Sequence, residues 1–243
     1  MINSLYWLFA FCIVGYFLGN INPALIITRI RKVDIKKAGS GNPGAMNVMR
    51  QLGFKLGMLT LLIDALKGAI PALIAFVSYG GRFDIGQNLS PENSYIALYA
   101  TGLAVILGHC FPVFLKFKGG KGFASMIGVF MIAHPWVSLL MFAIMAIYIA
   151  IAEYGAMGSF IYITVMVTYA ALQEFNLNYG PTVHILLLAF YFLSWYTHRT
   201  NIQRLLVGKE NTVTFLKAFN LKRLRKKQEK WLNSLRDGEN NLS

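Results

Sequence analysis

The stretch that decides the fold is LYWLFAFCIVGYFLGNINPALIITRI, an apolar run from Leu5 to Ile30. A bilayer core about 30 Å thick needs roughly 20 apolar residues per helix, so this run is long enough to cross a membrane. No basic flank precedes it and no small-residue cleavage site follows it, which argues against a removable signal peptide. We therefore expect a retained transmembrane helix at the start of the chain.

Six further apolar runs follow, near 56–79, 94–115, 123–134, 136–152, 156–174 and 182–197. The composition agrees with membrane spans, because 56% of the 243 residues are hydrophobic and only 14% are charged. Soluble domains carry about a quarter charged residues, so an ordinary water-soluble enzyme is excluded, as is a disordered chain before about residue 205. We expect an all-α polytopic membrane protein of seven transmembrane helices, with cytoplasmic glycine-rich loops that are re-entrant or amphipathic.

The formal net charge of +13 gathers in alternate connections between these runs. The other connections contain Arg82 as their one basic residue. Cytoplasmic loops of membrane proteins carry the excess of Lys and Arg, which predicts an outside N-terminus and a cytoplasmic C-terminus. The basic residues on the expected cytoplasmic side include Arg29, Arg31, Lys32, Lys36, Lys37, Arg50, Lys116, Lys118, Lys121, Arg199 and Arg204.

The charge pattern also divides the chain into a seven-helix domain over 1–207 and a basic cytoplasmic tail over 208–243. The tail is either a solvated segment that helps to set the topology or a surface helix that contacts anionic lipid. Nothing but charge supports nucleic acid as a partner, so none is expected. The two cysteines, Cys12 and Cys110, are too few for a disulfide framework, and we expect small buried or lipid-facing side chains there.

The first polar cluster is GSGNPGAMNVMR, residues 39–50. Its three glycines allow the backbone to approach a ligand closely and to present several N–H groups, while its side chains supply donors suited to phosphate. A loop of this composition is also typical of an ordinary turn, so both interpretations stay open from these residues alone. The candidate binding residues are Ser40, Gly41, Asn42, Gly44, Asn47 and Arg50.

A second cluster pairs Asp64 with Lys67, one helical turn apart inside an apolar run. Ionisable groups within a span are costly and normally mark function, although a structural ion pair near the membrane surface is the alternative. We expect Asp64 to support a ligand-binding Lys67.

The third cluster combines GHCFP, residues 108–112, with KFKGGKGFAS, residues 116–125. Lysines and glycines that lead into a helix N-terminus are typical of an anion site. The spacing excludes a Walker A loop, and His109 taken alone is as well explained by packing. The candidates here are His109, Lys118, Gly119, Gly120 and Lys121.

A fourth cluster contains Ser159 and, at the end of the last apolar run, His198 and Asn201. Basic flanking of a helix end is the alternative for the latter pair. All four clusters fall on the expected cytoplasmic face, which favours one shared anion site. The four histidines are scattered, so neither a metal nor another cofactor is expected.

At these residues the sequence resembles the bacterial membrane glycerol-3-phosphate acyltransferases that use acyl phosphate. The resemblance extends from about Gly15 to Glu210 and rests on five motifs in the same order. They read Ser-Gly-Asn-x-Gly-Ala-x-Asn-x-x-Arg, Asp-x-x-Lys-Gly, Gly-His-x-Phe-Pro, Lys-x-Lys-Gly-Gly-Lys-Gly and His-Arg-x-Asn-Ile. It implies seven spans, a site that faces the cytoplasm, and a location in the bacterial cell membrane.

The resemblance also implies transfer of a fatty acyl group from acyl phosphate to the 1-hydroxyl of sn-glycerol 3-phosphate, which forms lysophosphatidic acid for phospholipid biosynthesis. It implies catalytic roles for Ser40, His198 and Asn201, and a phosphate clamp made of Arg50 and Lys121. The other residues that it implies for binding are Gly41, Asn42, Gly44, Asn47, Lys67, His109, Lys118, Gly119, Gly120 and Ser159. The chain departs from the family pattern at Met46, where Thr is usual, at Ala156, where Ser is usual, and in its longer tail.

The expected chemistry needs several cations, because both substrates carry phosphate dianions. An acyl phosphate is already activated, so no enzyme nucleophile is required, and the general base is either His198 or the donor's own phosphate. A transporter of organic phosphate or another anion is the alternative function. A transporter needs basic residues along a path to the outside, whereas the outer connections offer only Arg82.

Overall fold

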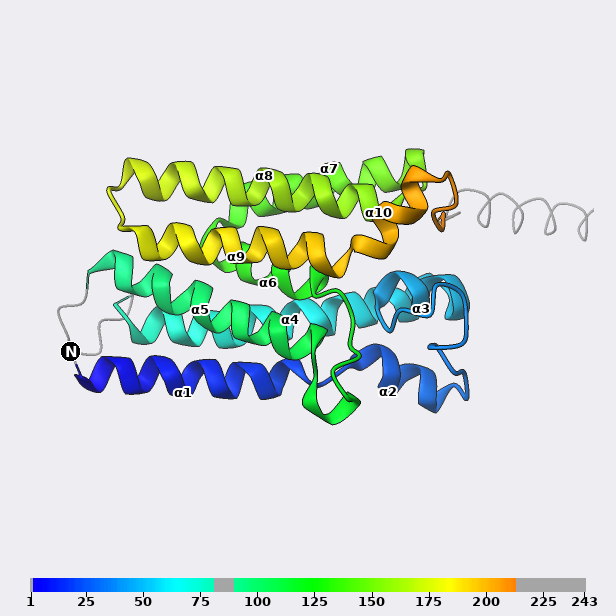
Figure 1. The fold of residues 1–243 in the computed structure, drawn as a ribbon, viewed down its shortest axis with the longest axis horizontal. Helices are drawn as coiled ribbons and strands as arrows, with labels where there is room; N and C mark the ends of the chain where they lie inside the picture. Colours follow the sequence, from blue (N-terminus) through cyan, green and yellow to red (C-terminus); the bar gives the residue numbers. More distant parts are fainter. Residues whose placement is uncertain (1, 81–89, 213–243) are drawn as a thin grey trace, which may run out of the picture.

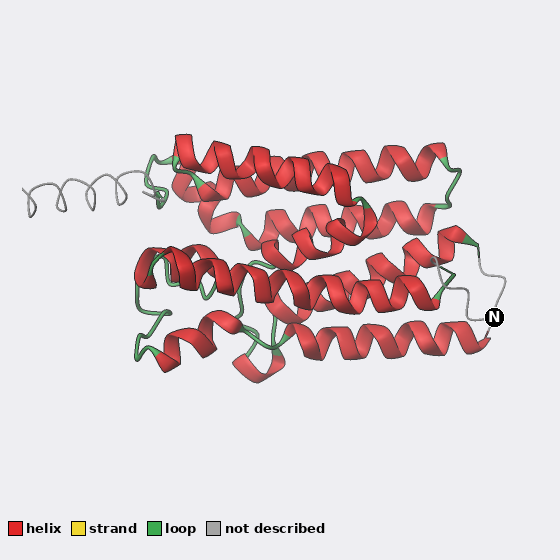
Figure 2. Ribbon diagram, turned by 180° about the vertical axis from the view of Figure 1, so that it is seen from behind, coloured by secondary structure: helices red, strands yellow, loops and turns green. Residues whose placement is uncertain are grey.

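The structure is a computed structural model that describes residues 2–80 and 90–212 (Figure 1). The regular elements in these two ranges are all helical, so the all-α prediction is confirmed (Figure 2). Most of the predicted tail lies outside the described residues, as does Arg82. The helices are α1 (Ile2–Gly19), α2 (Pro23–Ile30), α3 (Ala45–Leu52), α4 (Phe54–Ser78), α5 (Pro91–Cys110), the 3₁₀ turn η1 (Val113–Leu115), α6 (Phe123–Ala133), α7 (Pro135–Ala152), α8 (Gly155–Asn176), α9 (Pro181–Thr197) and α10 (Arg199–Leu206).

Five segments of the described chain are long and apolar enough to cross a membrane, which confirms a multi-pass membrane protein. They are Leu5–Ile30, Phe54–Ser78, Pro91–Leu115, Pro135–Ala152 and Gly155–Asn176. The two remaining predicted spans correspond to shorter apolar helices, Phe123–Ala133 and Pro181–Thr197.

The first apolar run is divided into two helices. Its helix α1 ends at Gly19, and α2 begins at Pro23 with Asn22 as its N-cap. The Asn22 side chain accepts a hydrogen bond of 3.0 Å from the backbone N–H of Leu25, and proline is favoured at a first helical position because its missing N–H would have no partner there. The break leaves the main-chain carbonyls of Gly19 and Ile21 for other groups to bind.

Close helix packing in the centre depends on small residues. A Cβ atom at Gly68 of α4 would lie 2.2 Å from the carbonyl oxygen of Ser125, and one at Gly128 of α6 would lie 2.0 Å from the carbonyl oxygen of Ala65. The Ser125 hydroxyl donates to the carbonyl of Asp64 at 2.9 Å and joins the same two helices. Small interfacial residues let membrane helices approach in this way, and here they hold α4 against α6.

The outward faces of the long helices are apolar. On α7 the exposed large hydrophobic side chains are those of Trp136, Leu139, Leu140, Ile144, Ile147 and Ile151. An exposed surface of this kind is unfavourable in water and suits lipid, so the packing agrees with a membrane setting.

The short helices gather at one end of the bundle, where α2, α3 and α10 lie opposite the N-terminus (Figure 1). We call this the α3 end. The sequence led us to expect a loop over residues 39–50, but α3 occupies Ala45–Leu52, so most of the first polar cluster is presented by a helix and the turn before it.

Candidate active site

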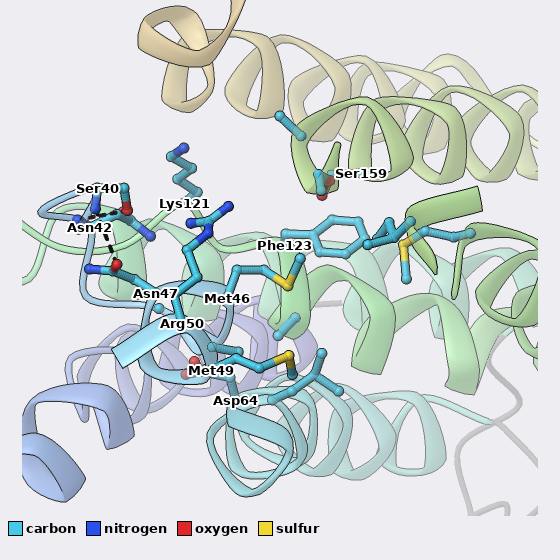
Figure 3. A pocket seen from close by; sticks show the side chains of 18 of the residues that line it. Ser40, Asn42, Met46, Asn47, Met49, Arg50, Asp64, Lys121, Phe123 and Ser159 are labelled. Carbon is cyan, nitrogen blue, oxygen red and sulfur yellow. Dashed lines mark hydrogen bonds between the residues drawn. The ribbon is translucent and has the colours of Figure 1, made fainter. Parts of the chain in front are cut away.

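A cavity of about 440 Å³ opens at the α3 end of the bundle, a volume typical of small-molecule sites (Figure 3). Segments far apart in the sequence meet there, from the turn before α3 to the residues after α10. Ten of the candidate residues line it: Ser40, Asn42, Gly44, Asn47, Arg50, His109, Lys121, Ser159, His198 and Asn201. The other five, Gly41, Lys67, Lys118, Gly119 and Gly120, do not.

Asn47 organises the turn that holds Ser40. Its Oδ1 accepts a hydrogen bond of 3.1 Å from the backbone N–H of Ser40 (Figure 3). Its Nδ2 donates to the carbonyls of Ile35 at 3.3 Å and Ala38 at 3.0 Å. Gly39 and Gly41 have φ angles of 58° and 72°, a region in which glycine is favoured. Because the buried Asn47 amide already uses both its donors, we assign it to positioning Ser40.

Arg50 projects from α3 into the cavity (Figure 3). Its Nε donates to the carbonyl of Thr212 at 3.0 Å, and its Nη2 donates to the carbonyl of Asn211 at 3.0 Å. Burial lowers the pKa of Arg50, and the nearby Glu210 carboxylate opposes that shift. A guanidinium has five N–H donors, so the contacts to the main chain leave capacity for an anion.

Lys121 lies at the end of the glycine-rich loop and donates to Oδ1 of Asn201. Burial lowers the pKa of Lys121 to about 8, with a further contribution from the Arg204 cation, while Glu210 acts in the opposite sense. A bound anion would stabilise the charged ammonium and so offset the effects of burial and of Arg204. Lys121 is therefore suited to bind an anion.

His198 joins α9 to α10 and is almost completely buried. Its Nδ1 lies 3.0 Å from the carbonyl oxygen of Ser194, which can only accept a hydrogen bond, so Nδ1 carries a proton. Burial and the Lys121 cation lower the pKa of His198 to about 4. The neutral ring thus keeps a lone pair on Nε2, as a proton acceptor requires.

Glu210 is the site residue that our sequence analysis did not identify. It lines the cavity, and its Oε1 accepts a hydrogen bond of 2.6 Å from Nδ2 of Asn201. Its Oε2 lies 3.2 Å from Nε of Arg204, so this carboxylate is a counter-charge to the cations at this side of the cavity. An isolated acid shortly after a basic segment, separated from it by Val207-Gly208-Lys209, was the available signal.

Lys67 has a different environment from the expected one. Its Nζ lies 2.8 Å from Oδ1 of Asp64 and 2.7 Å from Nδ1 of His109. It also donates to the carbonyls of Gly19 at 3.1 Å and Ile21 at 2.6 Å. The partly buried ammonium therefore satisfies carbonyls freed by the break between α1 and α2, and it fastens that break to α4 and α5.

Gly119 and Gly120 pack against the end of α5. Their N–H groups donate to the carbonyls of Cys110 and His109, each at 3.1 Å. A Cβ atom at Gly119 would lie 2.0 Å from the carbonyl oxygen of His109, and one at Gly120 would lie 2.1 Å from its Nε2. These two N–H groups are therefore bound to main-chain carbonyls of the protein. The glycines allow the close approach to α5 that positions Lys121.

The rest of the cavity wall is apolar and lies deeper in the bundle. Phe142, Met145 and Ile149 line it from α7, while Met58 and Leu61 line it from α4. A polar, cationic mouth therefore continues into a space suited to a hydrocarbon chain.

Two positions on α8 face this space. The hydroxyl of Ser159 donates to the carbonyl of Gly155 at 3.0 Å, which leaves its oxygen lone pairs free to accept. Ala156 also lines the cavity, so the departure from the family pattern at this position lies within the site.

Comparison with known proteins agrees with this geometry. The family model described as "Glycerol-3-phosphate acyltransferase" matches residues 9–208. The glycerol-3-phosphate acyltransferase of Thermoanaerobacter pseudethanolicus is 40% identical over 200 residues, which cover 82% of this chain and 92% of the relative. That of Aquifex aeolicus is 39% identical over 199 residues, which cover 82% and 95%.

Two solved structures of the integral membrane glycerol 3-phosphate acyltransferase PlsY (YgiH) are also similar. The glycerol 3-phosphate form is 36% identical with a TM-score of 0.71, and the match covers 89% of this chain and 98% of that one. The lysophosphatidic acid form is 37% identical with a TM-score of 0.68, and the match covers 88% and 97%. The family model matches most of the chain, and the matches to these relatives extend over almost their whole length. The chain therefore belongs to the glycerol-3-phosphate acyltransferase family.

Proposed function

We propose that this protein transfers a fatty acyl group from acyl phosphate to the 1-hydroxyl of sn-glycerol 3-phosphate, forming lysophosphatidic acid and inorganic phosphate. The observation that carries the proposal is a cavity with two chemically distinct parts. Arg50 and Lys121 line its mouth, and an apolar wall on α4 and α7 lines its depth. Both substrates carry phosphate, and the donor carries a hydrocarbon chain, so the two parts match the two kinds of group.

The cations allow two dianions to share one small site. Arg50 and Lys121 reach the cavity from α3 and from the loop before α6, and Arg204 adds positive charge at the Glu210 side. Charges placed in advance in a partly dehydrated site stabilise a transition state more strongly than the same charges in water. They also reduce the repulsion between the substrates, which favours the productive arrangement.

In the proposed step the acceptor hydroxyl oxygen attacks the acyl carbon of the donor. A new ester C–O bond forms, the acyl–phosphate C–O bond breaks, and phosphate departs with the electron pair. The hydroxyl proton passes either to Nε2 of His198 or to a phosphate oxygen of the donor. The neutral, buried His198 ring supports the first route, and the compact group of cations that would hold the donor phosphate supports the second.

Ser40, Ser159 and Asn201 supply neutral polar contacts around the reacting groups in this proposal. Ser40 is held by Asn47, and Asn201 is held between Lys121 and Glu210. Side chains fixed by neighbours in this way lose little entropy when a ligand binds, which favours tight and specific positioning.

We further propose seven membrane crossings, with α6 and α9 as the two short ones, an outside N-terminus and a cytoplasmic C-terminus. The α3 end then faces the cytoplasm, from which glycerol 3-phosphate would enter. The excess of Lys and Arg on this side supports the orientation. The family domain would occupy 1–207, followed by the basic tail at 208–243.

The donor is tested directly with purified protein in detergent, glycerol 3-phosphate, and either acyl phosphate or acyl-coenzyme A of the same chain length. We expect lysophosphatidic acid with acyl phosphate and none with the thioester. Robust turnover with acyl-coenzyme A alone would refute the donor assignment. Transport of organic phosphate, the alternative function, predicts glycerol 3-phosphate uptake into vesicles with no new ester.

A further inference from the structure

A second hollow of about 440 Å³ lies beside α2 and shares no lining residue with the candidate active site. Three cations line it, Arg29, Lys32 and Lys36, together with one carboxylate, Asp34. Leu25, Leu115 and neighbouring aliphatic side chains form the remainder of its wall. We call this hollow the basic groove.

The length of α1 bears on where the basic groove would lie in a membrane. The 18 residues of α1 alone span about 27 Å, close to the thickness of a bilayer core, so in the proposed orientation α2 and the groove would lie at the cytoplasmic membrane surface. The 3₁₀ turn that contributes Leu115 is held at the same level, because the ring of Phe114 lies 6.0 Å from that of Phe17 near the end of α1. Lipid phosphates occupy this level.

The groove combines charged and apolar side chains, as a phospholipid combines a charged headgroup with apolar acyl chains. Its cations outnumber its carboxylate by two, and Asp34 is already 3.7 Å from the ammonium of Lys37. The side chains of Ile26, Ile30 and Phe114, on α2 and the 3₁₀ turn, are exposed and would suit contact with lipid. An anionic headgroup and its acyl chains would meet complementary surfaces at once.

The backbone at Lys32 adds a further observation. Lys32 follows α2 with a φ angle of 56°, a left-handed conformation in which glycine is usual. The N–H groups of Lys32 and Val33 donate to the carbonyls of Arg29 and Thr28, a helix end of the Schellman type. A lysine in this strained position keeps a cation on the groove where glycine would make the same turn with less strain.

We infer that the basic groove binds the phosphate of an anionic phospholipid from the surrounding bilayer. Arg29, Lys32 and Lys36 would contact the headgroup, and the acyl chains would lie along α2 and Phe114. The site is separate from the proposed acyl-transfer cavity and does not depend on the identity of the acyl donor.

The test is a lipid titration of the delipidated full-length protein in detergent. Phosphatidylglycerol or phosphatidylcholine with identical acyl chains is added, and the bound lipid is counted by native mass spectrometry. We expect the wild type to bind phosphatidylglycerol in preference to phosphatidylcholine. The triple variant Arg29→Gln, Lys32→Gln, Lys36→Gln should bind phosphatidylglycerol at least about tenfold more weakly, since each cation near a membrane surface contributes to binding.

Two further variants separate a built site from diffuse charge. Arg31→Gln removes an exposed cation two positions from Arg29 that does not line the groove, and it should bind phosphatidylglycerol like the wild type. Asp34→Asn removes the carboxylate of the groove and should strengthen binding, a gain that misfolding cannot produce. Equal loss in Arg31→Gln and the triple variant, or unchanged binding in both the triple variant and Asp34→Asn, would overturn the inference.

Discussion

Arg50 is held by main-chain carbonyls on one side and faces the cavity on the other. Its planar guanidinium fits two oxygens at once, whereas a lysine offers a point charge. Arg50→Lys should therefore reduce kcat/KM about ten- to a hundredfold, since a hydrogen bond to a charged group contributes roughly 1.5–3 kcal/mol. Steady-state kinetics with both substrates measures the loss. The matched control is Arg199→Lys, an exposed arginine stacked on Tyr196 outside the cavity, and near-normal kinetics in Arg50→Lys would mean that the phosphate site is misplaced.

Lys121 should impose an alkaline limit on catalysis. Its pKa in the free protein is about 8, and only the protonated ammonium attracts phosphate. As the pH rises through this value, Lys121 loses its positive charge. The kcat/KM for the substrate that Lys121 binds should therefore fall above about pH 8. Lys121→Arg should move the fall to higher pH, and Lys121→Ala should remove it along with most of the activity. An unchanged fall in Lys121→Arg would assign it to another group.

For single residues, the sequence identified many that line the cavity but few of the groups to which they are hydrogen-bonded or ion-paired. Arg50, Lys121, His198 and Asn201 stand out because polar groups beside apolar runs are costly without a purpose. The environment of Lys67 was not foreseeable, because two of its partners are carbonyls released by a break in a neighbouring helix. Tertiary contacts of this kind leave no mark on local composition.

Among the helices, breaks were harder to predict than spans. Hydrophobicity predicted the apolar run from Leu5 to Ile30 but not its division at Asn22 and Pro23, since proline is tolerated within membrane helices as well as at their starts. The helix α3 was missed because three glycines and a proline precede it and resemble a turn. The family resemblance identified the residues of this segment without showing that a helix presents several of them.

The packing of α4 on α6 should be sensitive to a single added carbon. A Cβ atom at Gly128 would lie 2.0 Å from the carbonyl oxygen of Ala65, and main chain cannot move aside as a flexible side chain can. We expect Gly128→Ala to destabilise the protein by roughly 1–3 kcal/mol, as overpacking does. The measurement is thermal unfolding in detergent. Leu62→Ala, on the exposed face of α4, is the control and should change stability little, whereas an unaltered midpoint in Gly128→Ala would contradict the interface.

For the molecule as a whole, the end of the catalytic unit should lie just after α10. The carbonyls of Asn211 and Thr212 bind Arg50, and Glu210 binds Asn201. A chain that ends at Thr212 should therefore keep its activity, while one that ends at Gly208 should lose most of it. Size-exclusion chromatography measures how much of each truncated chain is folded, and a product assay measures its activity. The activity per amount of folded protein is then compared between the two chains. Inactivity of a well-folded chain ending at Thr212 would assign the remaining tail to the chemical step.

The whole-molecule architecture was the most predictable level, because membrane thickness directly constrains the length of apolar helices. Helical content and multiple spans followed from composition. Three segments meet at one cavity, namely the turn before α3, the loop before α6 and the end of α9. Because the sequence placed them on the same side of the membrane, their meeting was expected. The distances between them could be learned only from the structure.

The central claim is that acyl phosphate and glycerol 3-phosphate react together in this cavity, and one measurement tests it most directly. Purified wild-type protein is given acyl phosphate, and phosphate release is followed with and without glycerol 3-phosphate while lysophosphatidic acid is quantified. We predict release that requires glycerol 3-phosphate and matches lysophosphatidic acid mole for mole. Release that proceeds equally without glycerol 3-phosphate, or that yields no lysophosphatidic acid, would contradict the account.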